Sequence, residues 1–311
     1  MLVSGARVCY LLRTMLPALL TTLLWSVSVV CATRSTRYLG SAVANLTRLC
    51  LATVLLGLWA HGFGKGLGGA GLRFFLWSGF VGFGLGDLAL YEALPRIGSR
   101  LTLLLMQCLA APIGALLEWF WLGTTLSVAQ CVAGLAILLG VAVALAPGDH
   151  FHLDRKHLFS GTIFGVLAAI GLGGGAVLSR KAFQVAAQAG QSMDGGTAAY
   201  QRILGGIGVA VIYFALLRRR DRQAATAPRM EWHKAWPWVV VNTLGGPVLG
   251  VGCYQWALST TPSGIVLPIV ATLPLTVIPF AWRFEGDRPG ARSVIGGIIA
   301  VAGVIALTLV H

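Results

Sequence analysis

Asp87 and Arg48 are charged residues that lie inside long apolar stretches of this sequence. Asp87 comes seven residues before the end of the apolar run 72–94, so in a helix it would sit about 10 Å inside that end. Arg48 lies just inside the run 43–60 and would reach a similar depth. An ionisable group inside a membrane-spanning helix is costly and is by default a functional candidate. We interpret the two residues either as a structural ion pair or as a group for proton coupling or substrate contact, and a pair that breaks and re-forms would serve both roles.

Arg202 resembles Arg48 in its position inside an apolar run, here 197–217, but it lacks an acidic counterpart. The place that corresponds to Asp87 in the run 236–258 is close to Val251. The Arg202 side chain therefore either extends to the lipid headgroups or contacts the carboxylate or phosphate of a substrate.

Further polar side chains lie within apolar runs, where they would line a cavity or join helices by hydrogen bonds. Tyr91 follows Asp87 by one helical turn and shares its face. Without a way to separate cavity lining from helix pairing, we keep all of these side chains as candidates. The candidate substrate-binding or coupling residues are Asp87, Tyr91, Arg48, Gln107, Arg202, Asn242, Tyr254, Gln255 and Trp25.

Two other acidic residues are interpreted as structural. Glu92 precedes Arg96 by four residues next to a loop, a spacing that favours a salt bridge at the membrane surface. Glu118 lies near the end of its run beside Trp119 and Trp121, which are typical of an interfacial aromatic belt.

Several short motifs point to cofactor or metal chemistry only weakly. The segment 64–69 fits GxGxxG, but it lies in a short loop with no strand before it. His150, His152 and His157 could bind a metal, yet a solvated loop is the better interpretation. The six cysteines are scattered without a CxxC spacing, so neither a disulfide framework nor a zinc site is indicated. We expect no cofactor and no metal.

The histidines also bear on catalysis, because an intramembrane hydrolase would need a nucleophile with a nearby base, usually histidine. All six histidines fall in loops or at the terminus, so the chain is predicted not to be an enzyme.

Composition identifies the medium in which these residues act. The chain has 311 residues, of which 57% are hydrophobic and 11% charged, with a mean hydropathy of +0.81. A run of 18 or more apolar residues is a candidate membrane span. The net charge of +13 comes from basic residues in short gaps between apolar runs, so we expect contact with the lipid bilayer and none with nucleic acid. We place ten spans, at 16–32, 43–60, 72–94, 101–122, 126–146, 159–183, 197–217, 236–258, 265–284 and 291–310.

The two halves of the chain echo each other. Thr33-Arg34 corresponds to Ser179-Arg180, Ala93-Leu94 to Ala257-Leu258, and Pro112 to Pro274. Because each unit holds an odd number of spans, a tandem duplication must lie inverted in the membrane, an architecture typical of transporters. The sequence thus predicts an all-α polytopic membrane protein of ten transmembrane helices in two inverted five-helix repeats, 1–146 and 159–311, joined by the loop 147–158.

The order of these motifs resembles the EamA-type unit of the drug/metabolite transporter superfamily. The resemblance rests on Trp25-Ser26, the segment 91–94, Pro112, and the glycine ridge 134–141, with a second copy at 254–258, Pro274, Phe284-Glu285 and 297–304. Members usually carry an acidic residue at the turn after the fourth helix of each unit. Glu285 fills that role in the second unit, whereas Thr124-Thr125 stands there in the first.

The resemblance implies a secondary transporter that works by alternating access. We expect export of a small metabolite, amino-acid-like or drug-like compound, with proton coupling resting mainly on Asp87; a lipid-carrier flippase or another non-catalytic membrane protein is the alternative. The expected partners are a small-molecule substrate, protons and lipid, the chain being a monomer or homodimer in a bacterial inner (plasma) membrane. Loop charge favours termini outside the cell, whereas the resemblance, together with Arg7 and Arg13, favours termini in the cytoplasm.

Overall fold

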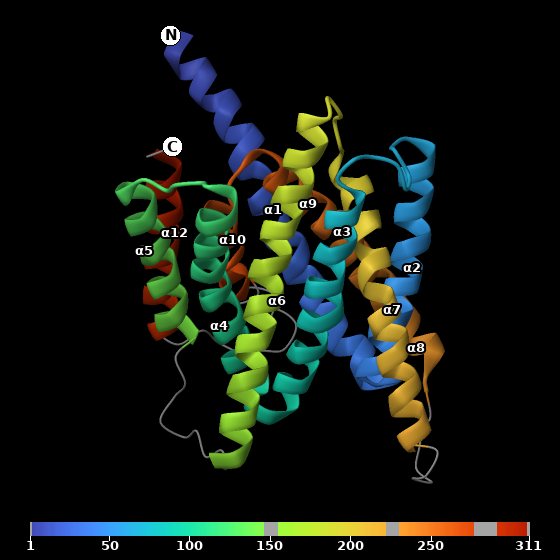
Figure 1. The fold of residues 1–311 in the computed structure, drawn as a ribbon. Helices are drawn as coiled ribbons and strands as arrows, with labels where there is room; N and C mark the ends of the chain where they lie inside the picture. Colours follow the sequence, from blue (N-terminus) through green and yellow to red (C-terminus); the bar gives the residue numbers. More distant parts are fainter. Residues whose placement is uncertain (1, 146–154, 222–229, 277–290, 310–311) are drawn as a thin grey trace.

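The structure, a computed structural model, describes residues 2–145, 155–221, 230–276 and 291–309. Within these ranges every regular element is a helix, as the long apolar runs predict. The helices lie side by side as a bundle, and α1 begins on the same side of it as α12 ends (Figure 1). The elements are α1 (Leu2–Leu39), α2 (Ser41–Gly62), α3 (Leu72–Gly79), η1 (Phe80–Gly86), α4 (Asp87–Leu122), α5 (Val128–Leu145), α6 (Arg155–Gln188), α7 (Gly195–Asp221), α8 (Trp232–Thr243), η2 (Leu244–Val248), α9 (Leu249–Thr260), α10 (Ser263–Val270) and α12 (Ala291–Leu309).

The chain reverses its direction within α4, although that element is helical from end to end. Along α4, its contacts with α6 first move toward the beginning of α6 and then back toward its end. In chain order they are Gly86 with Gly171, Ile97 with Gly161, and Ala110 with Gly173. The stretch between the descending and ascending parts contains Pro95, which cannot donate a backbone hydrogen bond. α4 therefore supplies the end of the third span and the whole of the fourth, as the predicted runs 72–94 and 101–122 require.

The third span of each repeat is interrupted in its middle by a π-helical segment. η1 interrupts the third span and η2 the eighth. The alignment of the repeats that matches Ala93 with Ala257 also matches the first residues of the two segments, Phe80 and Leu244. η1 has the sequence FVGFGLG, whose glycines tolerate the widened turn. η2 contains Pro247, which lacks a backbone N–H. Segments of this kind are frequent at functional sites.

The packing of the helices follows the predicted inverted duplication. α6, the first helix of the second repeat, packs along α3, η1 and α4 of the first repeat, and α1 packs along α8, η2 and α9 of the second. Equivalent helices also pair with each other, α2 with α7 and α5 with α12. Figure 1 shows α6 between α3 and α4, and α5 beside α12 at one edge. Each repeat therefore holds the third span of the other.

The backbones of α5 and α12 approach each other closely. A Cβ at Gly140 would lie 2.4 Å from the backbone nitrogen of Ala300, and one at Gly296 would lie 2.4 Å from that of Ala144. Close approach of helix backbones through small residues is a typical mode of packing in membranes. The glycine ridges that mark the ends of the two repeats in the sequence are thus packed against each other.

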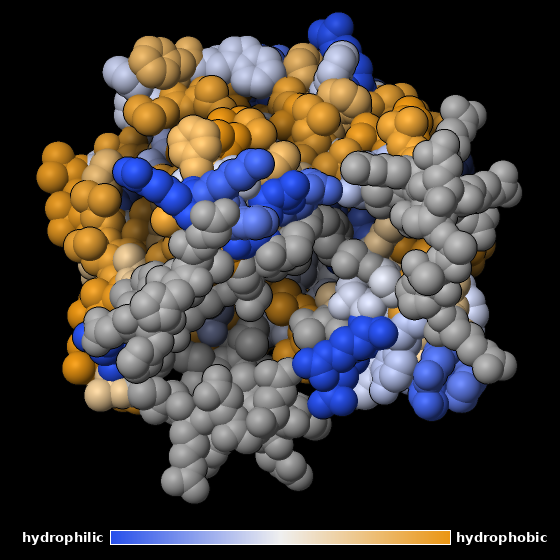
Figure 2. All heavy atoms as spheres, turned by 90° about the horizontal axis from the view of Figure 1, so that it is seen from below, coloured by the Kyte–Doolittle hydropathy of each residue, from blue (hydrophilic) through white to orange (hydrophobic). Residues whose placement is uncertain are grey.

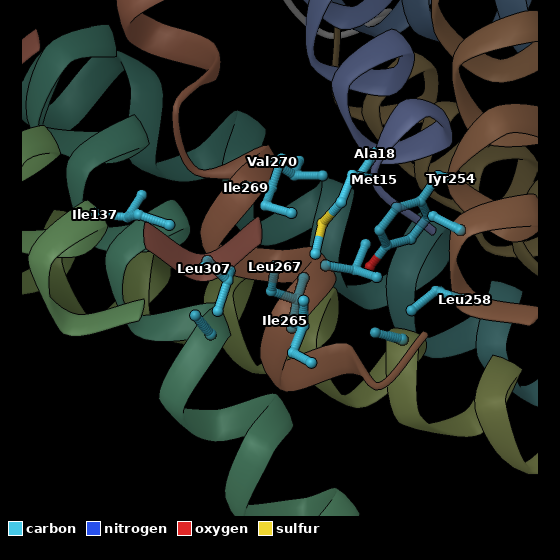
Figure 3. Packing of buried hydrophobic residues seen from close by; sticks show 14 of the residues in the cluster. Met15, Ala18, Ile137, Tyr254, Leu258, Ile265, Leu267, Ile269, Val270 and Leu307 are labelled. Atoms are coloured by element: carbon cyan, nitrogen blue, oxygen red, sulfur yellow. The ribbon is translucent and has the colours of Figure 1, made fainter. Parts of the chain in front are cut away.

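The largest core cluster gathers where α1, α9 and α10 meet (Figure 3). Met15 and Ala18 of α1 lie opposite Tyr254 and Leu258 of α9, with apolar side chains of α10 below them. All of α10 from Ile265 to Val270 is buried, so this short helix is enclosed by protein on every side.

The outer surface of the bundle is apolar, as expected of a membrane protein. Five helices of the described chain are long and apolar enough to cross a membrane. Large hydrophobic side chains on α5 and α12 are exposed, among them Leu135, Leu139, Ile298 and Val301. Seen from below, hydrophilic side chains gather within one end of the molecule while hydrophobic ones form much of its rim (Figure 2). The bundle is thus a multi-pass integral membrane protein with a hydrophilic face at the membrane surface.

Candidate functional site

The predicted ion pair between Arg48 and Asp87 is present. Arg48 Nη2 donates to Asp87 Oδ2 at 3.1 Å, and Arg48 Nε donates to Asn45 Oδ1 at 2.9 Å. Asp87 is the first residue of α4, directly after the π-helical segment η1. The pair therefore fastens the end of η1 to α2 within the first repeat.

Small residues hold η1 against the second repeat at the same level. A Cβ at Gly86 would lie 3.2 Å from Gly171 Cα, and one at Gly171 would lie 2.5 Å from Gly86 Cα, so neither position has room for a side chain. Two residues before η1, Ser78 Oγ donates to the carbonyl oxygen of Gly175 at 2.6 Å and lies 2.8 Å from Ser179 Oγ. η1 is therefore held to α6 on one side and, through Asp87, to α2 on the other.

Arg202 does not extend to the headgroups, which corrects one of the two interpretations made from the sequence. Its side chain is only 4% exposed. The guanidinium lies over the rings of Phe83 and Tyr254, with Cζ at 5.3 Å and 5.8 Å from the ring centroids. The cause is the glycine content of η1 and α6, because the absence of side chains at Gly82 and Gly175 leaves room for the guanidinium between helices.

The surroundings of Arg202 satisfy its charge only in part. A desolvated cation–π contact contributes about 1–2 kcal/mol, but a ring face accepts no conventional hydrogen bond from the five N–H donors of arginine. Nε is buried and has no hydrogen-bond partner among the described residues. A buried donor left without a partner costs about 1–3 kcal/mol. The guanidinium can therefore accept a further ligand, whereas that of Arg48 already has its carboxylate.

Aromatic side chains extend this site toward α1. Trp25 packs against Tyr254 with ring centroids 5.3 Å apart and planes tilted by 45°. The Tyr254 hydroxyl is buried without a partner in the described part of the chain. Gln255 also has both amide atoms unpartnered there, but as the next residue along a helix it projects about 100° away from Tyr254. Arg202, Tyr254 and Trp25 are thus brought together, and Gln255 points elsewhere.

Neither Asn242 nor Gln107 has a described contact with Arg202. Asn242, two residues before η2, accepts a hydrogen bond from Ser28 Oγ at 2.7 Å. Of its two interpretations, this is the helix-joining role. Gln107 of α4 is buried, and its Oε1 has no described partner. The side chain of Tyr91 lies outside the residues whose side chains the structure describes.

Sequence inspection missed a second buried ion pair. Glu118 is only 2% exposed rather than interfacial, and its Oε1 accepts from Arg180 Nε at 3.0 Å. Its Oε2 accepts from the backbone N–H of Ser263 at 2.6 Å and from the Ser263 hydroxyl. Arg180 also donates to the carbonyl of Leu258 at 2.9 Å. This network joins α4, α6, α9 and α10. The signal available in the sequence was the Ser179-Arg180 motif, which was used only to align the repeats.

The loop 63–71 is tied to α7 by hydrogen bonds. Gln201 Nε2 donates to the carbonyls of Gly66 and Gly68 at 2.9 and 3.0 Å. Asp194 precedes α7 and accepts from Thr197 N–H and Trp59 Nε1, both at 2.9 Å. Burial raises the pKa of Asp194, but the hydrogen bonds from Thr197 and Trp59 outweigh it and lower the pKa below its ordinary value. The glycine-rich motif is therefore a structural loop, as interpreted. No group of three or more metal-ligating side chains occurs in the described ranges; His150 and His152 lie outside them.

Comparisons with known proteins agree with this geometry. The model of the EamA-like transporter family matches residues 12–146 and 159–309, one match for each half of the chain. A protein of known crystal structure has the same fold, with a TM-score of 0.72 at 19% identity over 95% of this chain and 96% of that one. No match was found among curated proteins. Since the family matches cover nearly the whole chain, it belongs to the EamA-like transporter family, which places it within the drug/metabolite transporter superfamily of membrane transporters.

Proposed function

We propose that this transporter exports a small metabolite across a bacterial plasma membrane by alternating access, driven by protons that bind Asp87. The observation that carries the proposal is the Arg48–Asp87 ion pair at 3.1 Å, inside the bundle and directly after η1. Intramembrane carboxylates of this kind serve as proton relays in pumps and transporters.

The proposed coupling step is a protonation. A proton binds the Asp87 carboxylate and removes its negative charge, which leaves the Arg48 guanidinium without its partner. The end of η1 is then released from α2 and can move relative to α6. Charged groups of two helices bear on this step, because Arg48 of α2 contacts Asp87 and Arg202 of α7 lies over Phe83, a helical turn away.

The moving parts are the two interlocked spans that contain π-helical segments. Each is held to the first helix of the other repeat two residues before its π-helical segment, through the contacts of Ser78 with α6 and of Asn242 with α1. π-helical segments mark places where helices bend, so rocking of the repeats would concentrate at η1 and η2. Substrate would then be exposed alternately to the two sides.

Substrate-dependent proton movement tests this function. The full-length chain is reconstituted in vesicles that contain a pH-sensitive dye, and a panel of amino acids, organic acids, amines and toxic compounds is added. We expect at least one compound to move protons in wild type and not in Asp87→Asn. Glu231→Gln is the matched control, because it removes a carboxylate that pairs with Lys234 on the surface.

Two outcomes contradict the proposal. Near-normal proton-coupled flux in correctly inserted Asp87→Asn would remove Asp87 from the coupling step. Scrambling of a fluorescent lipid without any gradient, in the absence of metabolite transport, would instead favour the flippase alternative.

The proposal includes the orientation of the bundle in the membrane, that is, which end faces the cytoplasm. Described basic residues cluster at one end of the bundle, at the end of α1 and the starts of α6 and α8: Arg34, Arg37, Arg155, Lys156 and Lys234. Positive charge favours the cytoplasm, so we orient this end inward and the termini outward. A reporter fused at His311 that is active only in the cytoplasm would reverse this orientation.

A further inference from the structure

Arg202 lies where the two repeats meet, and one edge of its guanidinium faces bare backbone. A Cβ at Gly82 of η1 would lie 3.0 Å from Arg202 Nη2, and one at Gly175 of α6 would lie 3.3 Å from it. Three elements from both repeats, η1, α6 and α7, therefore surround the guanidinium, and α9 adds Tyr254. Movement of one repeat against the other would change this site directly.

The walls of the site are aromatic and come from both repeats. Phe83 of the first repeat and Tyr254 of the second both present ring faces to the guanidinium, and Trp25 of the first repeat packs against Tyr254. A ligand that reached Arg202 would thus have apolar surface beside its charged group.

Arg202 differs from three other arginines of the bundle in having no ion-paired carboxylate. Arg48, Arg96 and Arg180 pair with Asp87, Glu92 and Glu118. Within the described ranges no carboxylate pairs with Arg202, and its buried Nε has no hydrogen-bond partner. Arginine stays protonated in proteins, so it cannot become neutral by losing a proton. Asp87 acts electrostatically on Arg202, but its carboxylate is paired with Arg48 and not with Arg202. A water molecule would supply an acceptor but no negative charge.

We propose that Arg202 binds the carboxylate of a small organic monoanion whose apolar body lies against Trp25, Phe83 and Tyr254, and that this anion is the class of substrate transported. Arginine presents two parallel N–H donors that match a carboxylate. A single guanidinium balances one negative charge, which favours a monocarboxylate over a doubly charged phosphate. The assignment of the ligand as substrate rests on the proposed transport function; the assignment of the site does not.

Binding without any gradient tests the site. Purified full-length chain in detergent is titrated calorimetrically with phenylacetate, hexanoate, phenyl phosphate and the uncharged phenylacetamide. We expect a carboxylate to bind at least about tenfold more tightly than phenylacetamide, since a charge-assisted hydrogen bond is worth that factor or more. Phenyl phosphate should bind more weakly than phenylacetate.

Two variants locate the binding. Arg202→Gln should lose the preference for phenylacetate over phenylacetamide. Arg202→Lys keeps the positive charge but not the paired N–H donors of the guanidinium, so it should retain part of that preference. Arg73→Gln is the matched control, because Arg73 is exposed and contacts only the ring of Phe74. It should bind as wild type does.

The outcomes are separable from those of the transport proposal. Equal binding of phenylacetate and phenylacetamide to wild type, binding of neither carboxylate, tighter binding of phenyl phosphate, or an unchanged preference in Arg202→Gln would each overturn the site. Should Arg202→Gln fail to fold, the wild-type comparison and Arg202→Lys still decide. Carboxylate binding together with proton-independent flux would uphold the site and reject proton coupling.

Discussion

The two repeats carry an arginine at the same place, and only one of them is neutralised. Arg48 lies seven residues into α2 and Arg202 seven residues into α7. Arg48 donates to Asp87 directly after η1, while the corresponding place after η2 holds Val251, a buried apolar residue. Both repeats thus hold the cation and a π-helical segment, but a carboxylate at the position of Asp87 occurs in the first repeat alone.

The surroundings of the π-helical segments differ in a related way. Gly86 at the end of η1 faces Gly171 of α6, and Gly250 just after η2 faces the indole of Trp25 in α1. Gly171 in the first helix of the second repeat corresponds to Trp25 in the first helix of the first repeat. The alignment that matches Ser179-Arg180 with Thr33-Arg34 gives this correspondence. Glycine at this position lets α6 approach the backbone of η1 closely, whereas tryptophan places an indole against the backbone that follows η2. A symmetric scaffold therefore supports chemistry that is confined to one side.

Neutralising each arginine in turn should give the largest contrast. Arg48→Gln leaves Asp87 as an unpaired charge inside the bundle and should lower the free energy of unfolding by about 3 kcal/mol. Arg202→Gln leaves Asp87 paired with Arg48, so it should be neutral or stabilising by about 1 kcal/mol. Unfolding of the full-length chain in mixed micelles measures both values.

A double variant checks the cause of that contrast. Arg48→Gln combined with Asp87→Asn should recover most of the stability lost in Arg48→Gln, because neither charge is then stranded. Equal destabilisation by Arg48→Gln and Arg202→Gln would mean that Arg202 has a partner as strong as Asp87, and the comparison would fail.

The glycine contact gives the next largest effect. Gly171→Ala places a methyl group where 2.5 Å separates it from Gly86 Cα, and overpacking of this kind costs about 1–3 kcal/mol. Gly208→Ala is the control, because nothing lies within 4 Å of its Cβ. It should be stabilising by up to about 1 kcal/mol through helix propensity. Thermal unfolding of the two variants decides, and a Gly171→Ala protein as stable as wild type would show that η1 and α6 are not held rigidly.

Much of this organisation was predictable from the sequence, and the reason is the medium. Apolar runs that are long enough to cross a bilayer must form helices there. Because each half of the chain has an odd number of such runs, the second repeat must lie inverted relative to the first. The Arg48–Asp87 pair was predictable because both charges lie at the same depth from one side. The same reasoning applied to Glu118 was wrong, because depth along a helix does not reveal which neighbouring helix covers it.

Other features depended on contacts between helices far apart in the sequence. The burial of Arg202 results from glycines in α6 and η1, and no pattern within α7 reports them. The π-helical segments were also not predicted. Neither the glycines of η1 nor Pro247 of η2 indicated them, because the one-residue widening of a helical turn has no specific sequence signature.

The helix beginnings extend the comparison and carry the smallest expected effect. α2 begins after Gly40, which supplies no side-chain cap, whereas α7 begins after Asp194, at the equivalent position, which accepts hydrogen bonds from Thr197 and Trp59. Because the pKa of Asp194 is lowered in the folded chain, its ionised form contributes stability above the ordinary pKa of aspartate, about 4. That contribution is lost as the pH falls through the lower pKa that Asp194 has in the folded chain.

Asp194→Asn caps a helix nearly as well but does not titrate. The two proteins should therefore differ by less than about 1 kcal/mol at pH 7, and wild type should lose stability relative to the variant as the pH falls below about 4. Unfolding midpoints measured across this range test the effect, and parallel pH profiles would show that the charge of Asp194 does not stabilise α7.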